Sequence, residues 1–166
     1  FLLVRAVTPQ ANGLPMPPYS DAGFFWISKT LEVTPVDDSD PSPHLKVLEL
    51  QLPSAIFPSC EIPEAGEASR EDVVRVVGRS TAKLPLTISV ASAGRVVTVT
   101  RTLEPGKTAA VDLDGSPSIV EAWTEVHVFD TVRRIFTEMR RELKVSGQRG
   151  EFKMQLRLMN EVKLKD

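Results

Sequence analysis

The sequence predicts a mostly β fold, either a β-sandwich or a curved antiparallel sheet, with one amphipathic helix in the C-terminal half packed on it. Segments rich in β-branched and aromatic residues recur between turns that contain proline or glycine, which is typical of strands. Several of these segments alternate apolar and polar residues with a period of two. One later segment changes to a period of about 3.6, which indicates a helix.

Length and composition indicate one globular domain. The chain has 166 residues, of which 42% are hydrophobic and 25% charged, and its formal net charge is −2. These proportions are ordinary for a globular domain, and no apolar run approaches the roughly 18 residues that a membrane span needs. We expect an extended, proline-rich N-terminal arm over residues 1–23 and a single β-rich domain over residues 24–166.

The first half of this domain contains three predicted strands. Residues 24–34 are dense in aromatic and β-branched residues and stop at Pro35. Residues 45–52 form the second predicted strand, and residues 73–77 the third. The polar, acidic stretch between them, residues 61–72, is predicted to be a loop.

The middle of the chain predicts a series of antiparallel strands. Residues 84–90 and 95–103 read as a hairpin, followed by a type II turn with proline and glycine over residues 104–107. A strand over residues 108–113 ends at Asp114 and Gly115. Alternation resumes at Ile119 and places Val126 on one face and His127 on the other.

The predicted helix follows Asp130. Apolar residues then fall on one helical stripe: Val132, Ile135, Phe136, Met139 and Leu143. The Asp130 carboxylate suits the N-cap position, because it can accept the unpaired amides of a first turn. Gly147 is predicted to end the helix.

A long strand is predicted over residues 151–165, with apolar residues at every second position. Its length exceeds that of most strands in a domain of this size. We therefore expect residues 160–165 to lack a partner strand within the chain and to offer an edge to another chain.

No pattern of catalytic, cofactor-binding or metal-ligating residues is present, so we predict a protein that is not an enzyme and uses no cofactor or metal. His127 is interpreted as a surface histidine beside Glu125. The carboxylates of Asp112 and Asp114 precede a glycine at the wrong spacing for an EF-hand calcium loop, which favours a turn. The one cysteine, Cys60, permits no internal disulfide and favours a reducing intracellular compartment.

The distribution of charge is uneven. Residues 131–166 carry a net charge of +5, and the residues before them carry −7. A basic surface attracts anionic partners, so we predict binding to other protein subunits, including a second copy of the chain, with nucleic acid or an anionic membrane surface as further candidates. The predicted partner-binding residues come from the basic stretch and the unpaired strand end: Arg133, Arg134, Arg140, Arg141, Val162, Lys163, Leu164 and Lys165.

No motif assigns the whole chain to a family. Residues 17–19, Pro-Pro-Tyr, stand ahead of a phenylalanine-rich strand, and over this short stretch the chain resembles viral matrix proteins. The leading functional hypothesis is a non-enzymatic structural or interaction subunit of a larger assembly, which binds partner chains through β-edges, the extended arm and the basic C-terminal region. The resemblance implies an alternative, a viral matrix- or scaffold-type protein that engages anionic membrane or nucleic acid. An enzyme with an unrecognised carboxylate site is the third hypothesis.

Overall fold

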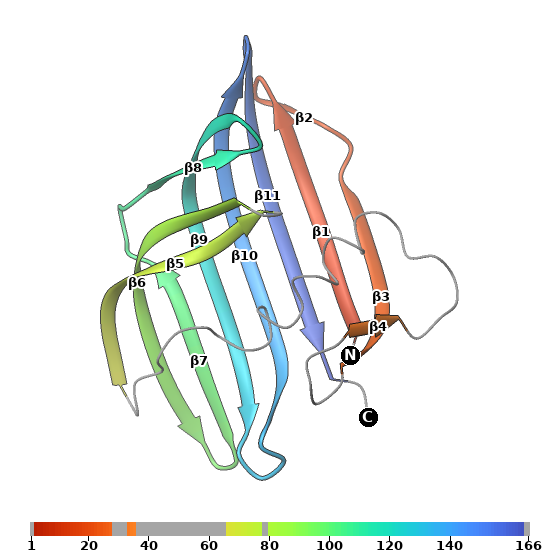
Figure 1. Ribbon diagram of the computed structural model, residues 1–166, viewed down its shortest axis with the longest axis vertical. Helices are drawn as coiled ribbons and strands as arrows, with labels where there is room; N and C mark the ends of the chain where they lie inside the picture. Colours follow the sequence, from red (N-terminus) through yellow and green to blue (C-terminus); the bar gives the residue numbers. More distant parts are fainter. Residues whose placement is uncertain (1, 28–32, 36–65, 78–79, 165–166) are drawn as a thin grey trace.

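The described residues form one antiparallel sheet of eleven strands (Figure 1). The computed structural model describes residues 2–27, 33–35, 66–77 and 80–164. Its strands are β1 (Leu2–Ala11), β2 (Leu14–Pro15), β3 (Tyr19–Ile27), β4 (Val33–Pro35), β5 (Gly66–Val77), β6 (Ser80–Ala93), β7 (Val96–Leu103), β8 (Ala109–Leu113), β9 (Ser116–Asp130), β10 (Ile135–Arg149) and β11 (Phe152–Lys163). They lie in the order β4-β3-β1-β11-β10-β9-β7-β6-β5, with β2 beside β1 and β8 beside β9. The prediction of a mostly antiparallel β fold is confirmed.

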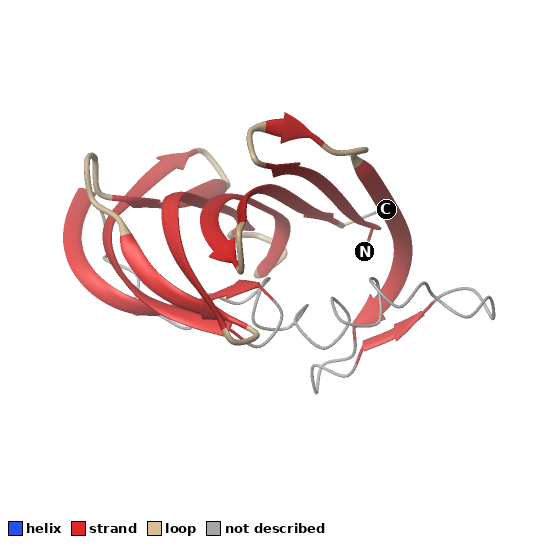
Figure 2. Ribbon diagram, turned by 90° about the horizontal axis from the view of Figure 1, so that it is seen from above, coloured by secondary structure: helices blue, strands red, loops and turns tan. Residues whose placement is uncertain are grey.

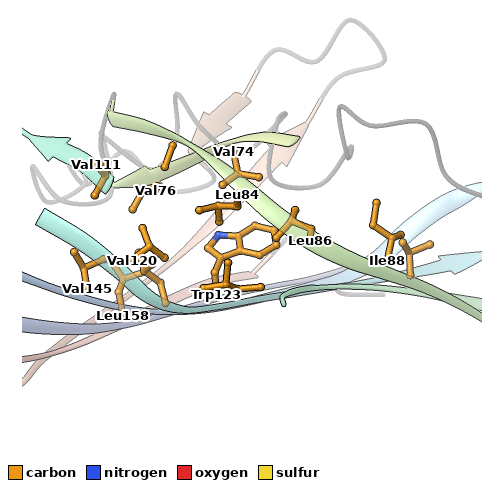
Figure 3. Close-up of a cluster of buried hydrophobic side chains, with 14 residues drawn as sticks. Val74, Val76, Leu84, Leu86, Ile88, Val111, Val120, Trp123, Val145 and Leu158 are labelled. Atoms are coloured by element: carbon orange, nitrogen blue, oxygen red, sulfur yellow. The ribbon is translucent and has the colours of Figure 1, made fainter. Parts of the chain in front are cut away.

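The sheet curves strongly and folds part of itself over its own face. Seen from above in Figure 2, the strands at one side curl back toward the middle of the sheet. In Figure 1, β5 and the start of β6 pass in front of β9 and β10. Figure 3 shows the result: Leu84 and Leu86 of β6 lie on one side of the core and Trp123 of β9 on the other. The apolar core therefore lies between two parts of one sheet.

The predicted amphipathic helix is wrong. The part of the chain that the structure describes contains no helix, and therefore none that is long and apolar enough to span a membrane. Residues 131–134 form a turn, and β10 follows and runs through Gly147 to Arg149. The Asp130 carboxylate does accept the backbone N–H groups of Val132 (2.9 Å) and Arg133 (3.0 Å), but it caps a hairpin turn.

A buried arginine explains this error. Met139, Leu143 and Val145 all point into the core, as alternate residues of a strand should. Arg141 occupies the remaining inward position and is buried as well. The charge at Arg141 interrupts the period of two in the sequence, so that the remaining apolar residues fit a helical stripe instead.

The central hairpins form as predicted. β6 pairs with β7 across a turn at Gly94, and β8 pairs with β9 across Asp114 and Gly115, both of which have positive φ (51° and 81°). A further turn connects β7 to β8, where Gly106 has a φ of 74° and the Lys107 N–H donates to the Glu104 carbonyl oxygen at 3.1 Å. Positive φ is easy for glycine, and it suits the turn types that the sequence indicates.

Two stretches near the N-terminus differ from the prediction. Most of the stretch predicted to be an arm forms β1, β2 and the start of β3, which belong to the sheet. The predicted loop over residues 61–72 is wrong from residue 66 onward, because β5 begins there. Cys60 and the predicted strand over residues 45–52 lie outside the described residues.

β11 lies in the interior of the sheet. It pairs with β1 on one side, from Lys163 opposite Leu2 to Met154 opposite Ala11. On the other side it pairs with β10, where Lys163 lies opposite Glu138. The expected unpaired strand end is therefore wrong through Lys163, because both of its edges are hydrogen-bonded within the chain.

Candidate functional site

A row of polar side chains crosses the buried face of the sheet. Arg101 of β7 is the Cα partner of Glu125 of β9, which is also the Cα partner of Arg141 of β10. Arg141 lies opposite Asn160 of β11. Directly opposite residues of paired strands share a face, and the exposed fractions of these four residues are 4%, 0%, 6% and 6%. We call Arg101, Glu125, Arg141 and Asn160 the charged row.

Glu125 is the centre of the charged row. Its Oε2 atom accepts hydrogen bonds from Nε (2.7 Å) and Nη2 (2.5 Å) of Arg141. Its Oε1 atom accepts a hydrogen bond from Nη2 of Arg101 and lies 2.8 Å from Nε2 of His127. Both carboxylate oxygens are thus occupied by cationic or polar nitrogens, as a buried carboxylate requires.

Arg101 links the charged row to the strand that covers the core. Its Nη1 atom donates to Oδ2 of Asp72 in β5 at 3.4 Å. Its guanidinium also lies 5.3 Å from the centre of the Trp123 ring, a distance typical of a cation–π contact. Two carboxylates, one from each layer, therefore face this arginine.

The surroundings of Glu125 keep it ionised. Burial by itself raises the pKa of the Glu125 carboxyl, but the positive charge of Arg141, the hydrogen bond with His127 and the charge of Arg101 together hold this pKa well below its ordinary value. Opposite charges at close range favour the ionised form strongly where water is excluded. Glu125 is consequently an ionised carboxylate held between the guanidinium groups of Arg101 and Arg141.

His127 is completely buried, so the interpretation of this residue as a surface histidine is wrong. Its ring packs edge-on against Phe136, with 5.7 Å between the ring centres. Its Nε2 atom faces Glu125, and its Nδ1 atom has no hydrogen-bond partner among the described residues. The inward face of β9 is therefore the one that carries Glu125 and His127, opposite to what their polarity predicts.

A carboxylate hydrogen-bonded to a histidine is a pair that acid–base catalysis often uses. Here neither Glu125 nor His127 has exposed surface, and both oxygens of the carboxylate are already occupied. Among the described residues no group of three or more histidine, cysteine or acidic side chains is arranged to hold a metal ion. The arrangement suits a structural role, in which matched charges fix the register of β7, β9 and β10.

The predicted partner-binding residues do not form one surface. Arg133 and Arg134 lie in the exposed turn between β9 and β10. Arg140 is exposed on the outer face, where it donates to Glu142 at 2.5 Å, while its neighbour Arg141 belongs to the charged row.

The remaining predicted residues belong to β11 and its end. Val162 is buried in the sheet. The Lys163 ammonium lies 2.8 Å from the Glu161 carboxylate, and this hydrogen bond, with the charge of Glu138, raises the pKa of Lys163. The Leu164 N–H donates to the Thr137 carbonyl oxygen at 2.8 Å, and Lys165 lies outside the described residues.

The charged row was missed in the sequence, although a signal for it exists. Arg101 stands between Val99 and Leu103 on the apolar positions of β7. Arg141 stands in the same way between Met139 and Leu143 in β10. An arginine at an inward position in two strands indicates a buried anion between them, because an unpaired charge is rarely buried.

At one end, the inner face of the sheet extends beyond the part that β5 and β6 cover. Along β11 the inward residues become steadily more exposed, from Leu158 (2%) to Met154 (44%) and Phe152 (61%). Leu14 of β2 lies in the same row as Met154, separated from it by Ala11. Met16 is held beside β1, because its N–H donates to the Pro9 carbonyl oxygen at 3.0 Å. We call the four exposed residues Leu14, Met16, Phe152 and Met154 the apolar end.

Two hollows border the apolar end. One has a volume of about 700 Å³ and the other about 210 Å³, and both are lined by Ser118, Gly147 and Met154. A Cβ atom on Gly147 would lie only 2.3 Å from Oγ of Ser118. The lack of a side chain at Gly147 thus lets β9 and β10 approach closely here and keeps the floor of the hollows open.

Comparisons of the chain with protein-family models, curated proteins and solved structures find no match.

Proposed function

We propose that the protein is a non-enzymatic interaction subunit of a larger assembly and that it binds a partner protein through the apolar end. The gradient of exposure along β11 is the observation that carries this proposal. Leu158 is covered by β5 and β6, whereas Met154 and Phe152, on the same face of the same strand, are not. Large apolar side chains that gather on one surface are typical of a binding site.

The chemistry of the apolar end indicates the kind of partner. The adjoining hollow of about 210 Å³ is bordered by Leu113, Val145 and Leu156, so it offers space for an apolar side chain. Aromatic and methionine side chains at the centre of an interface supply much of its binding energy. We expect a partner that inserts an aliphatic or aromatic side chain into this hollow, with Phe152 packed beside it.

The buried charges support a binding role over catalysis. Glu125 and His127 form a catalytic type of pair, but they are enclosed and face two arginines that are already hydrogen-bonded to Glu125. A substrate would have to displace these contacts, which would leave charges unpaired in the core. The charged row instead fixes the register of the strands, and the apolar end lies on the same sheet.

Site-specific photocrosslinking tests the proposal. A photoreactive phenylalanine analogue is placed at position 152 in cells that make the protein. A separate control variant carries the analogue at position 73 instead. Val73 is also exposed, but it lies on β5, away from the apolar end. We expect one defined adduct from position 152 and none from position 73, and Met154→Ser should reduce the adduct at least several-fold.

The mass of the adduct identifies the partner as a second copy of the chain or as another protein. Far-UV circular dichroism should be unchanged and melting only slightly changed in Met154→Ser, because Met154 is already 44% exposed. Adducts of equal yield from positions 73 and 152, or an absence of adducts at both, would contradict the proposal.

A further inference from the structure

The opposite end of the sheet combines three arginines with an exposed valine. Arg95 lies in the β6–β7 turn, and Val132, Arg133 and Arg134 lie in the β9–β10 turn. Figure 1 shows these two turns next to each other at the lower end of the sheet, far from the β10–β11 hairpin. We call Arg95, Val132, Arg133 and Arg134 the basic tip.

Hydrogen bonds tie the two turns together. The backbone N–H and the side-chain hydroxyl of Thr131 both donate to the carbonyl oxygen of Arg95, at 2.8 and 2.9 Å. Val96 also lies opposite Asp130 in the ladder between β7 and β9. The three arginines are therefore presented from one connected piece of backbone.

The acidic residue of these two turns points inward. Asp130 is almost fully buried, and its Oδ1 atom accepts the N–H groups of Val132 and Arg133. Its Oδ2 atom lies 3.6 Å from Nε of Arg95, whose side chain is 70% exposed. Among the described residues, these two turns thus combine three arginines with one carboxylate, and that carboxylate is buried.

An apolar side chain stands among these cations. Val132 is 73% exposed, more than any other large hydrophobic residue for which the structure describes a side chain. The aromatic residues behind it, Phe129 and Phe136, are half-buried and pack against each other with 5.1 Å between ring centres. They are not presented as a platform for nucleic-acid bases, which stack on aromatic side chains.

We propose that the basic tip docks on an anionic lipid surface. The arginines bind phosphate or carboxylate groups of the lipid headgroups, and Val132 enters the layer just beneath them. A valine at the apex favours lipid over nucleic acid, because the edge of a membrane accepts an apolar side chain and a phosphate backbone does not. This contact goes beyond the proposed protein partner and uses the other end of the molecule.

Vesicle flotation of the intact chain tests the proposal. Vesicles of phosphatidylcholine alone are compared with vesicles that contain about one third phosphatidylserine, at low salt and at roughly 0.15 M salt. We expect binding only to the anionic vesicles and a steep loss of binding with salt. Replacing Arg95, Arg133 and Arg134 by Gln should weaken binding roughly a hundred-fold, since each basic residue near such a surface contributes about fivefold.

A matched variant controls for net charge. Replacing Lys83, Lys144 and Arg157 by Gln removes the same charge from exposed ion pairs on the strands, away from the basic tip. This control should keep the affinity of the unchanged chain within about threefold. An equal loss in both triple variants, or binding to neutral vesicles of the same strength, would overturn the proposal.

A further variant separates lipid from nucleic acid. Val132→Ser leaves the charge unchanged and should weaken binding to anionic vesicles by a few-fold, while its binding to a DNA duplex of defined length stays the same. Binding to DNA that is tighter than binding to the anionic vesicles, with no effect of Val132→Ser on either, would overturn the proposal in favour of nucleic acid. Met154→Ser should bind vesicles normally, so a failure of the apolar end as a protein-binding site is measured separately.

Discussion

The two faces of the sheet formed by β7, β9, β10 and β11 carry similar charged residues in opposite surroundings. On the inner face, Glu125 lies between Arg101 and Arg141 with almost no exposed surface. On the outer face, Glu142 lies near Arg140 and Arg157, and these side chains are between 36% and 72% exposed. The residue types are the same, but water is excluded from only one of the two sets.

This difference teaches how the position of an ion pair decides its effect. An exposed pair gains little when it forms, because water already solvates both charges. A buried set costs much to desolvate, and removing one member leaves the others without compensation. The inner set should therefore be sensitive to single substitutions, and the outer set tolerant of them.

The largest effect is expected from Glu125→Ala. Two buried arginines would lose their shared anion, which should reduce the free energy of unfolding by about 3–5 kcal/mol, out of a total of roughly 5–15 kcal/mol. Urea denaturation measures this loss. The control Glu142→Ala should cost about 1 kcal/mol or less, and similar losses in the two variants would show that burial does not separate the two faces.

The second prediction concerns acid stability. The pKa of Glu125 is lowered in the folded chain, so the unfolded chain takes up its proton first as the pH falls. The stability from this carboxylate is fully present above the ordinary pKa of glutamate, about 4.3, and is lost progressively below it. We expect the difference in unfolding free energy between the unchanged chain and Glu125→Gln to shrink from pH 6 toward pH 3. A difference that stays constant over this range would contradict a lowered pKa of Glu125 in the folded chain.

Replacing all three charged members of the charged row should reduce the free energy of unfolding less than removing Glu125 alone. The triple variant Arg101→Leu, Glu125→Leu, Arg141→Leu removes all three charges together and leaves none of them unpaired. We expect its unfolding free energy to lie within about 2 kcal/mol of the unchanged chain, above that of Glu125→Ala. If the triple variant is less stable than Glu125→Ala, the charged row contributes more to the free energy of unfolding than the mutual compensation of its charges.

The smallest effect is expected on the outer face. A double-mutant cycle on Arg140 and Glu142, each changed to Ala, should give a coupling energy of about 0.2–1 kcal/mol. This value should fall when salt is raised from about 0.1 M to 1 M, because the Debye length shortens from roughly 10 to 3 Å. A coupling above 2 kcal/mol that is independent of salt would mean that the outer pair behaves like a buried one.

The sequence predicted the segments whose turns and alternation agree. The hairpin of β6 and β7 was foreseen because Val99 and Leu103 alternate with threonines up to a glycine turn. β10 was mistaken for a helix because Arg141 takes an inward position, and no local rule shows that an arginine is buried. The partner that makes this burial affordable, Glu125, comes from a different strand.

The same limit explains the errors around the candidate site. Glu125 and His127 are polar, so period-two alternation placed them on the wet face of β9, whereas they lie on the core side. The length of β11 predicts an unpaired end, and this prediction is wrong because the second neighbour of β11, β1, comes from the other end of the sequence. A proline-rich stretch gave no sign that β1 and β3 would join the sheet, since pairing over such a distance depends on the whole fold.

The place of β1 beside β11 also has a consequence for how the chain folds. From β5 to β11, neighbours in the sheet are neighbours or near neighbours in the sequence, so their ladders form by closing short loops. The ladder from Leu2–Lys163 to Ala11–Met154 instead joins residues more than a hundred positions apart, and such contacts form slowly. The strands β5 to β11 should therefore assemble first and leave one side of β11 as a template. β1 then docks on this template together with β3, and until it does, the same template is open to β1 of a neighbouring molecule, the route by which domain-swapped dimers arise.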